Sequence, residues 1–228
     1  MVSKNKNLND LGVPGVYKRT LAGGRALIRA VRGESAAKAI GDLKPDCEIF
    51  GFTKGQFSCI DLIEHCLNET GPADVFIATW SAAAGDIQRA HKFLGNGKIK
   101  SIRFLVDYSF QSRKPEFCQE LIDLFGYEAL RVTVTHAKYV LIINEKWNLV
   151  IRTSMNLNYN PRFENFEISD DKAMAAFHIE IIDEIWNSQE RAEGFKGTPG
   201  DNKRKFRSQF REATAFDSSE MTDVRDLI

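Results

Sequence analysis

THAKYVLIINEKWNLVIRTSMNLNYNPRFENFEI, residues 135–168, contains two apolar runs rich in β-branched side chains. The polar residues 144–146 stand between these runs, and this pattern predicts a β-hairpin. If residues 144–146 form the whole turn, Ile143 pairs with Trp147. A turn of four residues would shift the register by one position and move the side chains of one strand to the other face of the sheet.

Five polar side chains flank this hairpin: His136 and Lys138 before it, and Ser154, Asn156 and Glu167 after it. Because residues i and i+2 of a strand project from one face, each of the first two pairs should point together. A three-residue turn would also place Ser154 opposite His136, so that four side chains converge at one end of the hairpin. A histidine, a lysine, a hydroxyl, an amide and a carboxylate can attack a phosphodiester without a metal ion. Alternatively, the histidine is structural, and the serine and asparagine cap the following loop.

These residues resemble a catalytic motif of the phospholipase D superfamily, in which an H-x-K triplet, a strand, an S-x-N segment and a later glutamate follow one another. An H-x-K triplet alone is common, whereas the combination is rare by chance. The chain departs from the family pattern at two positions. Ile143, followed by Asn144, stands where the family has aspartate, and Thr153 stands where it has glycine. The lost aspartate puts the catalytic rate in doubt more than the fold.

The resemblance implies covalent catalysis, in which His136 attacks phosphorus and forms a phosphohistidine. The same residue of a second protomer would protonate the leaving oxygen and then activate water. Glu167 would orient an imidazole ring, and Lys138, Ser154 and Asn156 would stabilise the charge on the phosphoryl oxygens. The scheme requires no metal and no other cofactor. Because the chain has one H-x-K motif and family enzymes use two, the resemblance implies a homodimer with a shared site.

Four further residues near the motif have both a functional and a structural interpretation. Arg152 and Arg162 could bind phosphate, and a structural ion pair is equally consistent with each position. Arg152 falls on the His136 face if the turn has three residues. Trp80 and Asp107 end predicted strands and could point toward the site, but core packing for the tryptophan and a helix or loop cap for the aspartate explain them better.

Strand and helix patterns alternate along the chain, which predicts an α/β fold. The expected architecture is a phospholipase D-like mixed, largely parallel sheet flanked by helices on both faces, with one motif per chain. Strands are expected at 47–52, 74–80, 101–106 and 130–134, and helices at 57–68, 86–94, 116–125 and 171–186. The last helix contains His178, to which no chemistry is assigned.

Charge is balanced overall, with 31 basic and 31 acidic residues in a chain of 228. Its distribution suggests three parts: a basic, partly helical N-terminal arm (1–40), a phospholipase D-like domain (41–190) and a polar, basic C-terminal tail (191–228). Basic ends attract phosphate backbones, although solvated arms are the commoner explanation of such runs. In the tail, Phe206 and Phe210 lie among basic residues, where they could stack on bases or pack on the domain.

The four cysteines lack the spacing of a zinc site and are expected to be reduced and buried. No apolar run approaches the ~20 residues of a membrane helix, and the first ten residues lack the apolar core of a secretory signal. A cytoplasmic protein that does not bind membranes is therefore expected.

The leading hypothesis is a metal-independent nuclease that acts on nucleic acid, with DNA favoured over RNA. The alternative is a dimeric phospholipase D-like protein that binds nucleic acid or serves in assembly with little or no catalysis. The compact chain with one motif also resembles phage- or prophage-encoded members of the superfamily.

Overall fold

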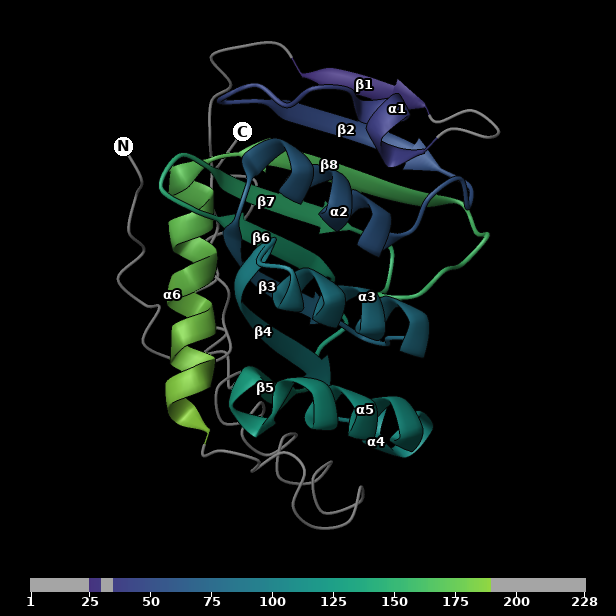
Figure 1. Cartoon of the computed structure of the whole chain (residues 1–228), viewed down its shortest axis with the longest axis vertical. Coiled ribbons are helices and arrows are strands. Elements are labelled where there is room, and N and C mark those ends of the chain that lie inside the picture. The colour runs from purple at the N-terminus through teal and green to yellow at the C-terminus, as the bar shows by residue number, and fades with distance from the viewer. Residues whose placement is uncertain (1–24, 30–34, 190–228) are drawn as a thin grey trace, which may run out of the picture.

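The computed structural model describes residues 25–29 and 35–189 (Figure 1). Its helices and strands are β1 (Ala26–Arg29), α1 (Ala36–Ile40), β2 (Glu48–Thr53), α2 (Cys59–Thr70), β3 (Ala73–Thr79), α3 (Ala84–Gly95), β4 (Ile99–Asp107), α4 (Phe110–Arg113), α5 (Pro115–Phe125), β5 (Leu130–Thr133), β6 (Tyr139–Ile143), β7 (Asn148–Thr153), β8 (Glu164–Asp170) and α6 (Lys172–Ser188). A single 3₁₀ turn, η1 (Tyr127–Ala129), precedes β5.

The described strands form one sheet in the order β1-β2-β8-β7-β6-β3-β4-β5. The predicted mixed sheet with helices on both faces is confirmed. Six of these strands run in one direction, whereas β6 and β8 run in the other. Four of the seven neighbouring pairs are consequently antiparallel and three are parallel. The expectation of a largely parallel sheet therefore holds for strand direction but is wrong for pairing, because β6 and β8 lie between strands of the opposite direction.

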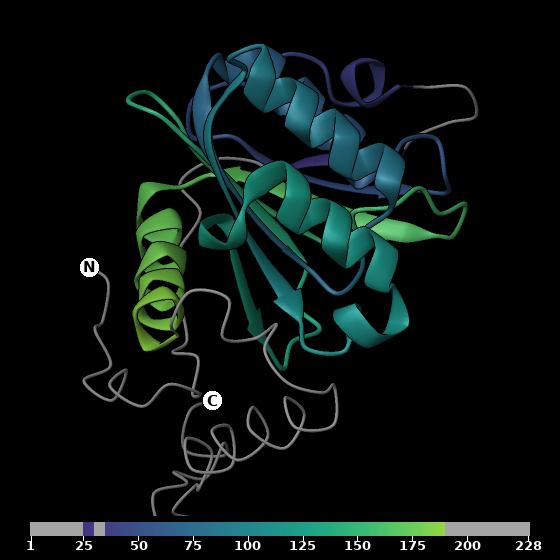
Figure 2. The ribbon, with the colours of Figure 1, turned by 60° about the horizontal axis from the view of Figure 1, so that its bottom comes forward.

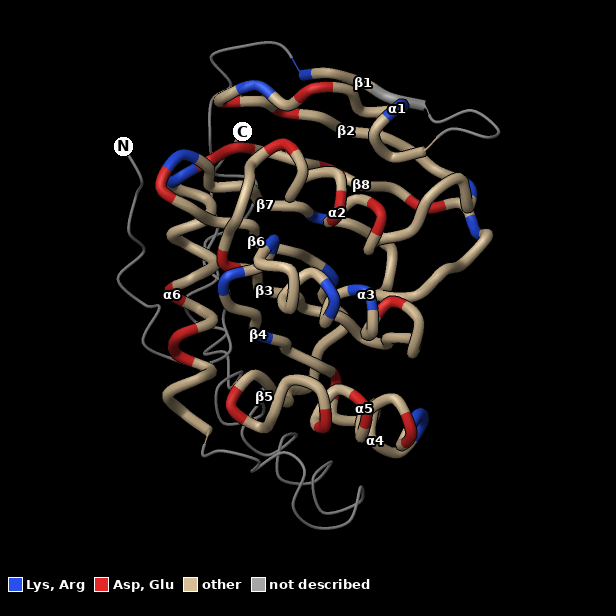
Figure 3. The backbone as a smooth tube through the Cα atoms, in the orientation of Figure 1, with Lys and Arg blue, Asp and Glu red and all other residues tan. Residues whose placement is uncertain are grey.

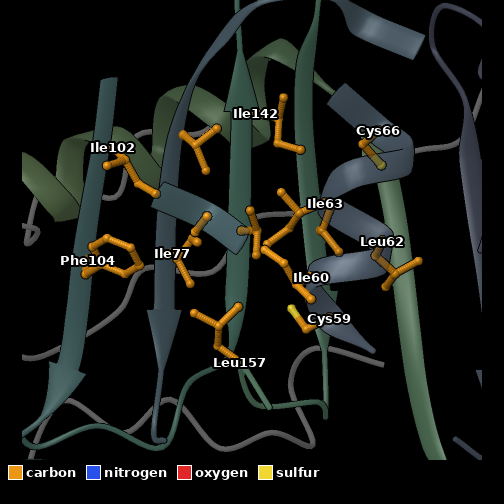
Figure 4. Close-up of a cluster of buried hydrophobic side chains, with 14 of the residues drawn as sticks. Cys59, Ile60, Leu62, Ile63, Cys66, Ile77, Ile102, Phe104, Ile142 and Leu157 are labelled. Carbon is orange, nitrogen blue, oxygen red and sulfur yellow. The ribbon is translucent and has the colours of Figure 1, made fainter. Parts of the chain in front are cut away.

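The main core lies between the sheet and a layer formed by α1, α2, α3 and α5, which cover one face (Figures 1 and 4). Alternate residues of the strands point into this layer, as strand geometry requires. Ile77, Phe104 and Ile142 from three neighbouring strands meet Ile60 and Ile63 of α2 (Figure 4), and none of the five is more than 1% exposed. This face, called the inner face below, is nearly continuous hydrophobic packing.

The opposite face, called the outer face below, carries α6, which stands apart from α3 and α5 in Figure 2. Met174, Ala175 and Ile182 of α6 pack on Leu141 and Val150, in a smaller apolar cluster that also includes residues of β3 and β4. The Asp171 carboxylate starts the helix by accepting hydrogen bonds from the amides of residues 173 and 174. Helix α6 thus covers the centre of the sheet, and its apolar cluster includes no residue of β1, β2 or β8.

The predicted strands and helices are all found, with ends shifted by a few residues, and two further strands appear. β1 joins β2 in parallel, and β8 joins β2 to β7. β1 and α1 lie within the segment assigned to the N-terminal arm, so part of that segment extends the sheet. The predictions for residues 1–24 and for the tail 191–228, Phe206 and Phe210 included, concern residues outside the described part of the chain.

The hairpin of β6 and β7 has a different register from the predicted one. Ile143 pairs with Asn148, not with Trp147, because the turn has four residues. The Asn144 side chain shapes this turn: its Oδ1 accepts hydrogen bonds from the amides of Lys146 and Trp147, at 2.9 and 3.0 Å. The prediction of a three-residue turn is therefore wrong, and every pair along the hairpin shifts by one position.

Candidate functional site

Strand ends gather at one edge of the sheet, called the carboxyl edge below. β2, β3, β4 and β7 end there, and β6 and β8 begin there. In open α/β sheets, ligands bind beyond the carboxyl ends of the parallel strands. The predicted site residues lie on segments that begin or end at this edge, namely His136, Lys138, Arg152, Ser154, Asn156, Arg162 and Glu167.

His136 and Lys138 lie on the short segment that leads into β6, and their side chains are in contact. The Lys138 Nζ lies 3.2 Å from Nδ1 of the imidazole and donates a hydrogen bond to the His136 carbonyl at 3.1 Å. Burial lowers the pKa of the Lys138 ammonium, and the nearby carboxylate of Glu164 opposes this effect. An ammonium beside Nδ1 needs a lone pair on that atom, so the neutral ring carries its proton on Nε2 in this arrangement.

A buried carboxylate at the end of β4 fixes the segment that carries His136. Asp107 accepts a hydrogen bond from the Thr135 amide at 3.1 Å and another from the Ser109 amide at 3.0 Å. The Thr135 hydroxyl then accepts a hydrogen bond from the amide of Ala137. Asp107 is therefore a loop cap, as expected, and it positions the residue that directly precedes His136.

The imidazole of His136 is exposed and lies against the half-buried ring of Trp80, with 5.5 Å between ring centroids. On this indole lies the guanidinium of Arg113, 3.6 Å from the ring centroid. Arg113 also donates to the Trp80 carbonyl at 2.7 Å and to Ser109 at 2.9 Å, and burial lowers its pKa. The Trp80 ring thus contacts both the imidazole of His136 and the guanidinium of Arg113.

β8 holds the serine of the motif. Ser154 donates a hydrogen bond from its hydroxyl to the Glu164 carboxylate and accepts one from the Asn165 amide at 2.9 Å. The Ser154 amide in turn donates to the Asn165 carbonyl at 3.1 Å. Thr153, which replaces the glycine of the family pattern, donates its hydroxyl proton to the same carbonyl. The serine is therefore fixed to the strand that also carries Glu167.

Glu167 lies in the middle of β8 and contacts two arginines. Its Oε1 is 2.6 Å from the Arg152 guanidinium and 3.2 Å from that of Arg25, which also pairs with Glu48. No hydrogen bond to an imidazole is found for Glu167 among the described residues. The structure therefore places this carboxylate in an ion-pair network on the outer face, and Arg152 takes part in the structural ion pair that the sequence allowed.

Several of these side chains line an open cavity of about 380 Å³ between the carboxyl edge and α6. It is lined by Ala137, Lys138, Tyr139, Arg152, Thr153, Ser154, Asn165, Glu167 and His178. The cavity is large enough for a phosphate with part of a nucleoside, and its lining includes the cations Lys138 and Arg152, the latter ion-paired with the carboxylate of Glu167. Elsewhere, Lys and Arg are interspersed with Asp and Glu along the described chain (Figure 3).

The four-residue turn explains which residues share this cavity. In the observed register Tyr139 pairs with Arg152, and the Lys138 carbonyl accepts a hydrogen bond from the Thr153 amide. Arg152 therefore shares the outer face with Tyr139, and the three-residue register that would have placed it on the His136 face does not form. His136 and Ser154 both lie outside the residues that pair in this hairpin, so the predicted pair of His136 with Ser154 does not form.

Two predicted residues lie away from the cavity. Asn156 follows β7, and its Oδ1 is buried without a hydrogen-bond partner among the described residues. Arg162 is exposed in the loop before β8. Of the seven predicted residues, Lys138, Arg152, Ser154 and Glu167 line the cavity, and His136 reaches it only through Lys138.

Sequence reasoning assigned no role to two residues at this site, Arg113 and His178. The Nδ1 of His178 lies 2.8 Å from the Met174 carbonyl one turn earlier in α6, which leaves Nε2 as an acceptor on a cavity-lining ring. Burial lowers the pKa of His178, and the charge of Arg152 lowers it further. No local pattern reveals either residue, because both reach the site from other parts of the chain.

Within the described part of the chain, no helix has both the length and the apolar composition needed to cross a bilayer.

The fold and the carboxyl edge together define an α/β protein with a histidine–lysine pair beside an open polar cavity. No family model matches the sequence, and no curated protein is significantly similar to it. Among solved structures, the chain is similar to Nuc from Salmonella typhimurium, described as a phospholipase D family member, at 17% identity and a TM-score of 0.44. That similarity covers 61% of this chain and 93% of Nuc.

Two further solved structures are similar to the chain. NucT from Helicobacter pylori is 14% identical, with a TM-score of 0.44 and coverage of 62% of this chain and 97% of NucT. Polyphosphate kinase from Porphyromonas gingivalis is 11% identical, with a TM-score of 0.46 and coverage of 63% of this chain but only 26% of the kinase. Likenesses of this strength concern the course of the chain and not its chemistry.

Proposed function

We propose that the protein is a metal-independent phosphodiesterase of nucleic acid, a nuclease that acts through a phosphohistidine on His136. One observation carries the proposal: an exposed imidazole in contact with Lys138 at the carboxyl edge, beside a cavity lined by Lys138, Arg152 and Ser154. This set supplies a nucleophile, fixed positive charge and a hydroxyl, which phosphoryl transfer needs. The basic residues near both ends of the sequence favour a polyanionic substrate.

In the first step, Nε2 of His136 attacks phosphorus, so that a P–N bond forms and the P–O bond to the leaving group breaks. The leaving oxygen takes a proton from His136 of a second copy of the chain. In the second step this second imidazole removes a proton from water, the water oxygen attacks phosphorus, and the P–N bond breaks. The nucleophilic ring needs its proton on Nδ1, whereas the Lys138 contact suits the ring that donates from Nε2.

A movement of the Lys138 side chain can determine which of these two tautomers the imidazole of His136 adopts. Beside Nδ1 it stabilises the donor form of the imidazole, and when its ammonium turns toward a bound phosphate it leaves Nδ1 free to carry a proton. The lowered pKa of Lys138 fits a group that is partly removed from water and gains an anionic partner when substrate binds. Ser154 and Arg152 face the same cavity and would hold the non-bridging oxygens.

The test is hydrolysis in excess chelator of single-stranded DNA, duplex DNA, RNA and a generic phosphodiester. We expect His136→Ala to reduce the rate by at least about 10³-fold. The matched control is His91→Ala, which removes an exposed histidine of α3 that packs against Phe125 of α5. Full activity of His136→Ala, or no hydrolysis of any substrate by the wild type, contradicts the proposal.

Two further measurements examine the finer steps. Acid-sensitive, base-stable phosphate on the chain during turnover, absent in His136→Ala, would identify the covalent intermediate. Sedimentation at the concentration used for the assays measures the oligomeric state, and a homodimer is expected. An active monomer would remove the shared site from the proposal without removing the role of His136.

A second candidate function is nucleic-acid binding or assembly with little turnover. The contacts of Glu167 favour it, because both partners are arginines and neither is an imidazole. Ile143, at the position of the family aspartate, also favours this second function. Binding that weakens steeply with salt, in a wild-type protein that cleaves nothing, would select this function.

A further inference from the structure

We propose that exposed aromatic residues beside the site bind the unpaired bases of single-stranded nucleic acid. The aromatic platform, as it is called below, consists of Phe52, Tyr159 and Phe163, together with the cations Lys54 and Arg162. This inference rests on the proposed function, since it specifies the substrate class of the same site. Of these five residues, only Arg162 is among the predicted site residues.

The centre of the platform is a pair of stacked rings. Phe52 at the end of β2 and Phe163 before β8 lie with centroids 4.9 Å apart and planes 17° from parallel. Phe163 is 67% exposed and Phe52 is 37% exposed, although large apolar side chains are usually buried. Phe50 supports Phe52 edge-on at 5.1 Å. Phe52 is thus held between two rings, and Phe163 is the more exposed ring of the stack.

The platform is held together by two loops in close contact. The Tyr159 hydroxyl donates to the Gly55 carbonyl at 3.3 Å, and the tyrosine is 63% exposed. Gly55 has a φ of +76°, and a Cβ at this position would lie 2.7 Å from the Cα of Pro161. Only glycine allows the loop after β2 to approach the loop before β8 so closely. An arrangement of this kind reduces the entropy lost when a ligand binds.

The platform is continuous with the cavity. Phe52 pairs with Asn165 in the β2–β8 ladder, and Asn165 lines the cavity and donates its amide proton to Ser154. Phe163 directly precedes Glu164, the partner of Ser154. A single-stranded nucleic acid with one phosphate in the cavity would therefore bring a neighbouring base to the stacked rings.

Charge decides between nucleic acid and an apolar partner. Lys54 and Arg162 flank the rings, both are exposed, and neither forms an ion pair with another described residue. Aromatic rings interleaved with free cations are typical of surfaces that bind single strands, because every base has a π face and every linkage has a negative charge. A docking site for an apolar protein surface would leave both cations facing it without a counter-charge.

The experiment measures binding of full-length protein by fluorescence anisotropy, with His136→Ala in all variants to prevent cleavage. The probes are oligothymidine of about 12 nucleotides, an abasic strand of the same length, and a duplex. We expect oligothymidine to bind about tenfold more tightly than the abasic strand. Phe163→Ala should abolish this preference and leave abasic binding unchanged, whereas Phe163→Trp should retain it.

The matched control is Leu27→Ala, which removes another exposed apolar side chain, 77% exposed, from β1 on the outer face. It should leave all three affinities unchanged. Equal binding of the two single strands by the starting protein overturns the inference, as does an equal loss of both after Phe163→Ala. A change of oligomeric state in Phe163→Ala also overturns it, because the platform would then be an interface between copies.

The outcome is distinguishable from failure of the proposed function. The distinguishing measurement is hydrolysis of a base-free phosphodiester by the wild-type protein, with His136 intact. If the wild type hydrolyses that substrate but shows no preference for bases, the inference fails and the function stands. If it prefers bases but hydrolyses nothing, the binding surface stands and the nuclease proposal fails.

Discussion

The two faces of the sheet differ in what they bury. Toward α2, α3 and α5, the inner face is packed with apolar side chains that are almost entirely excluded from water. The outer face is apolar only beneath α6, and beyond that helix it carries the ion pairs of Glu167 and the aromatic platform. In this sheet, the apolar packing that stabilises the fold is concentrated on the inner face, and part of the outer face is left available for ligands.

The largest expected effect comes from emptying the inner face. Phe104 is fully buried in β4 and packs on Phe125 at 4.9 Å. Phe104→Ala should lower the free energy of unfolding by about 3–5 kcal/mol, because a large cavity remains. Urea unfolding measures this loss. Leu27→Ala on the outer face should change the same quantity by less than about 0.5 kcal/mol, and similar losses in both variants would contradict the contrast.

The next effect concerns the absence of a side chain at Gly51, where β2 passes the buried ring of Phe166. A Cβ at Gly51 would lie 2.4 Å from Cζ of that ring, too close for a real contact. Gly51→Ala should therefore cost about 1–3 kcal/mol through overpacking. Gly85→Ala is the control, since nothing lies within 4 Å of an added Cβ there. It should stabilise α3 by about 0.5–1 kcal/mol, and a loss at Gly85 equal to that at Gly51 would argue against overpacking.

Asp86 is a buried carboxylic acid within the otherwise apolar inner layer. Burial raises its pKa from 3.8 to about 6, and its Oδ2 is buried without a partner among the described residues. Because the folded state holds the proton more tightly than the unfolded state, stability is lost as the pH rises from 3.8 through about 6. Asp86→Asn should add about 1–2 kcal/mol to the unfolding free energy at pH 8, with the gain vanishing near pH 4. A gain that does not depend on pH would assign it to another cause.

The smallest effect belongs to the outer face. The pKa of His178 is lowered by burial, so the folded state binds its proton less tightly than the unfolded state does. Stability should therefore fall as the pH drops below 6.5, the ordinary value for histidine. His178→Gln should flatten that slope by less than about 1 kcal/mol, because the ring is partly exposed. Identical pH profiles for the two proteins would indicate that the ring titrates as it does in water.

Much of the fold was predictable because its central strands are continuous apolar runs. Most of β3 and the second half of β4 are buried on both faces, so these stretches are almost uniformly hydrophobic. β8 was missed because polar residues interrupt its apolar pattern: Glu164 binds Ser154, Asn165 lines the cavity, and Glu167 pairs with two arginines. β1 was missed because four residues that follow a glycine pair give little signal.

The candidate site was predictable by residue type but not by geometry. His136 and Lys138 were recognised from their spacing, and they do lie in contact. The register depends on the hydrogen bond from the Trp147 amide to the Asn144 side chain. This bond closes a turn that is one residue longer than the predicted one. Arg113 reaches Trp80 across 33 positions of sequence, a distance over which no local pattern is informative.

The turn at Asn144 also has a practical consequence, because it lies at the end of β6 opposite the carboxyl edge. Its amide group donates to the carbonyls of Thr70 and Pro72, which fixes the turn to the end of α2. Glu145 within this turn is exposed. A fluorophore or a surface tether attached at position 145 would therefore leave the carboxyl edge facing solution. Binding and release of a nucleic-acid ligand could then be observed on single molecules.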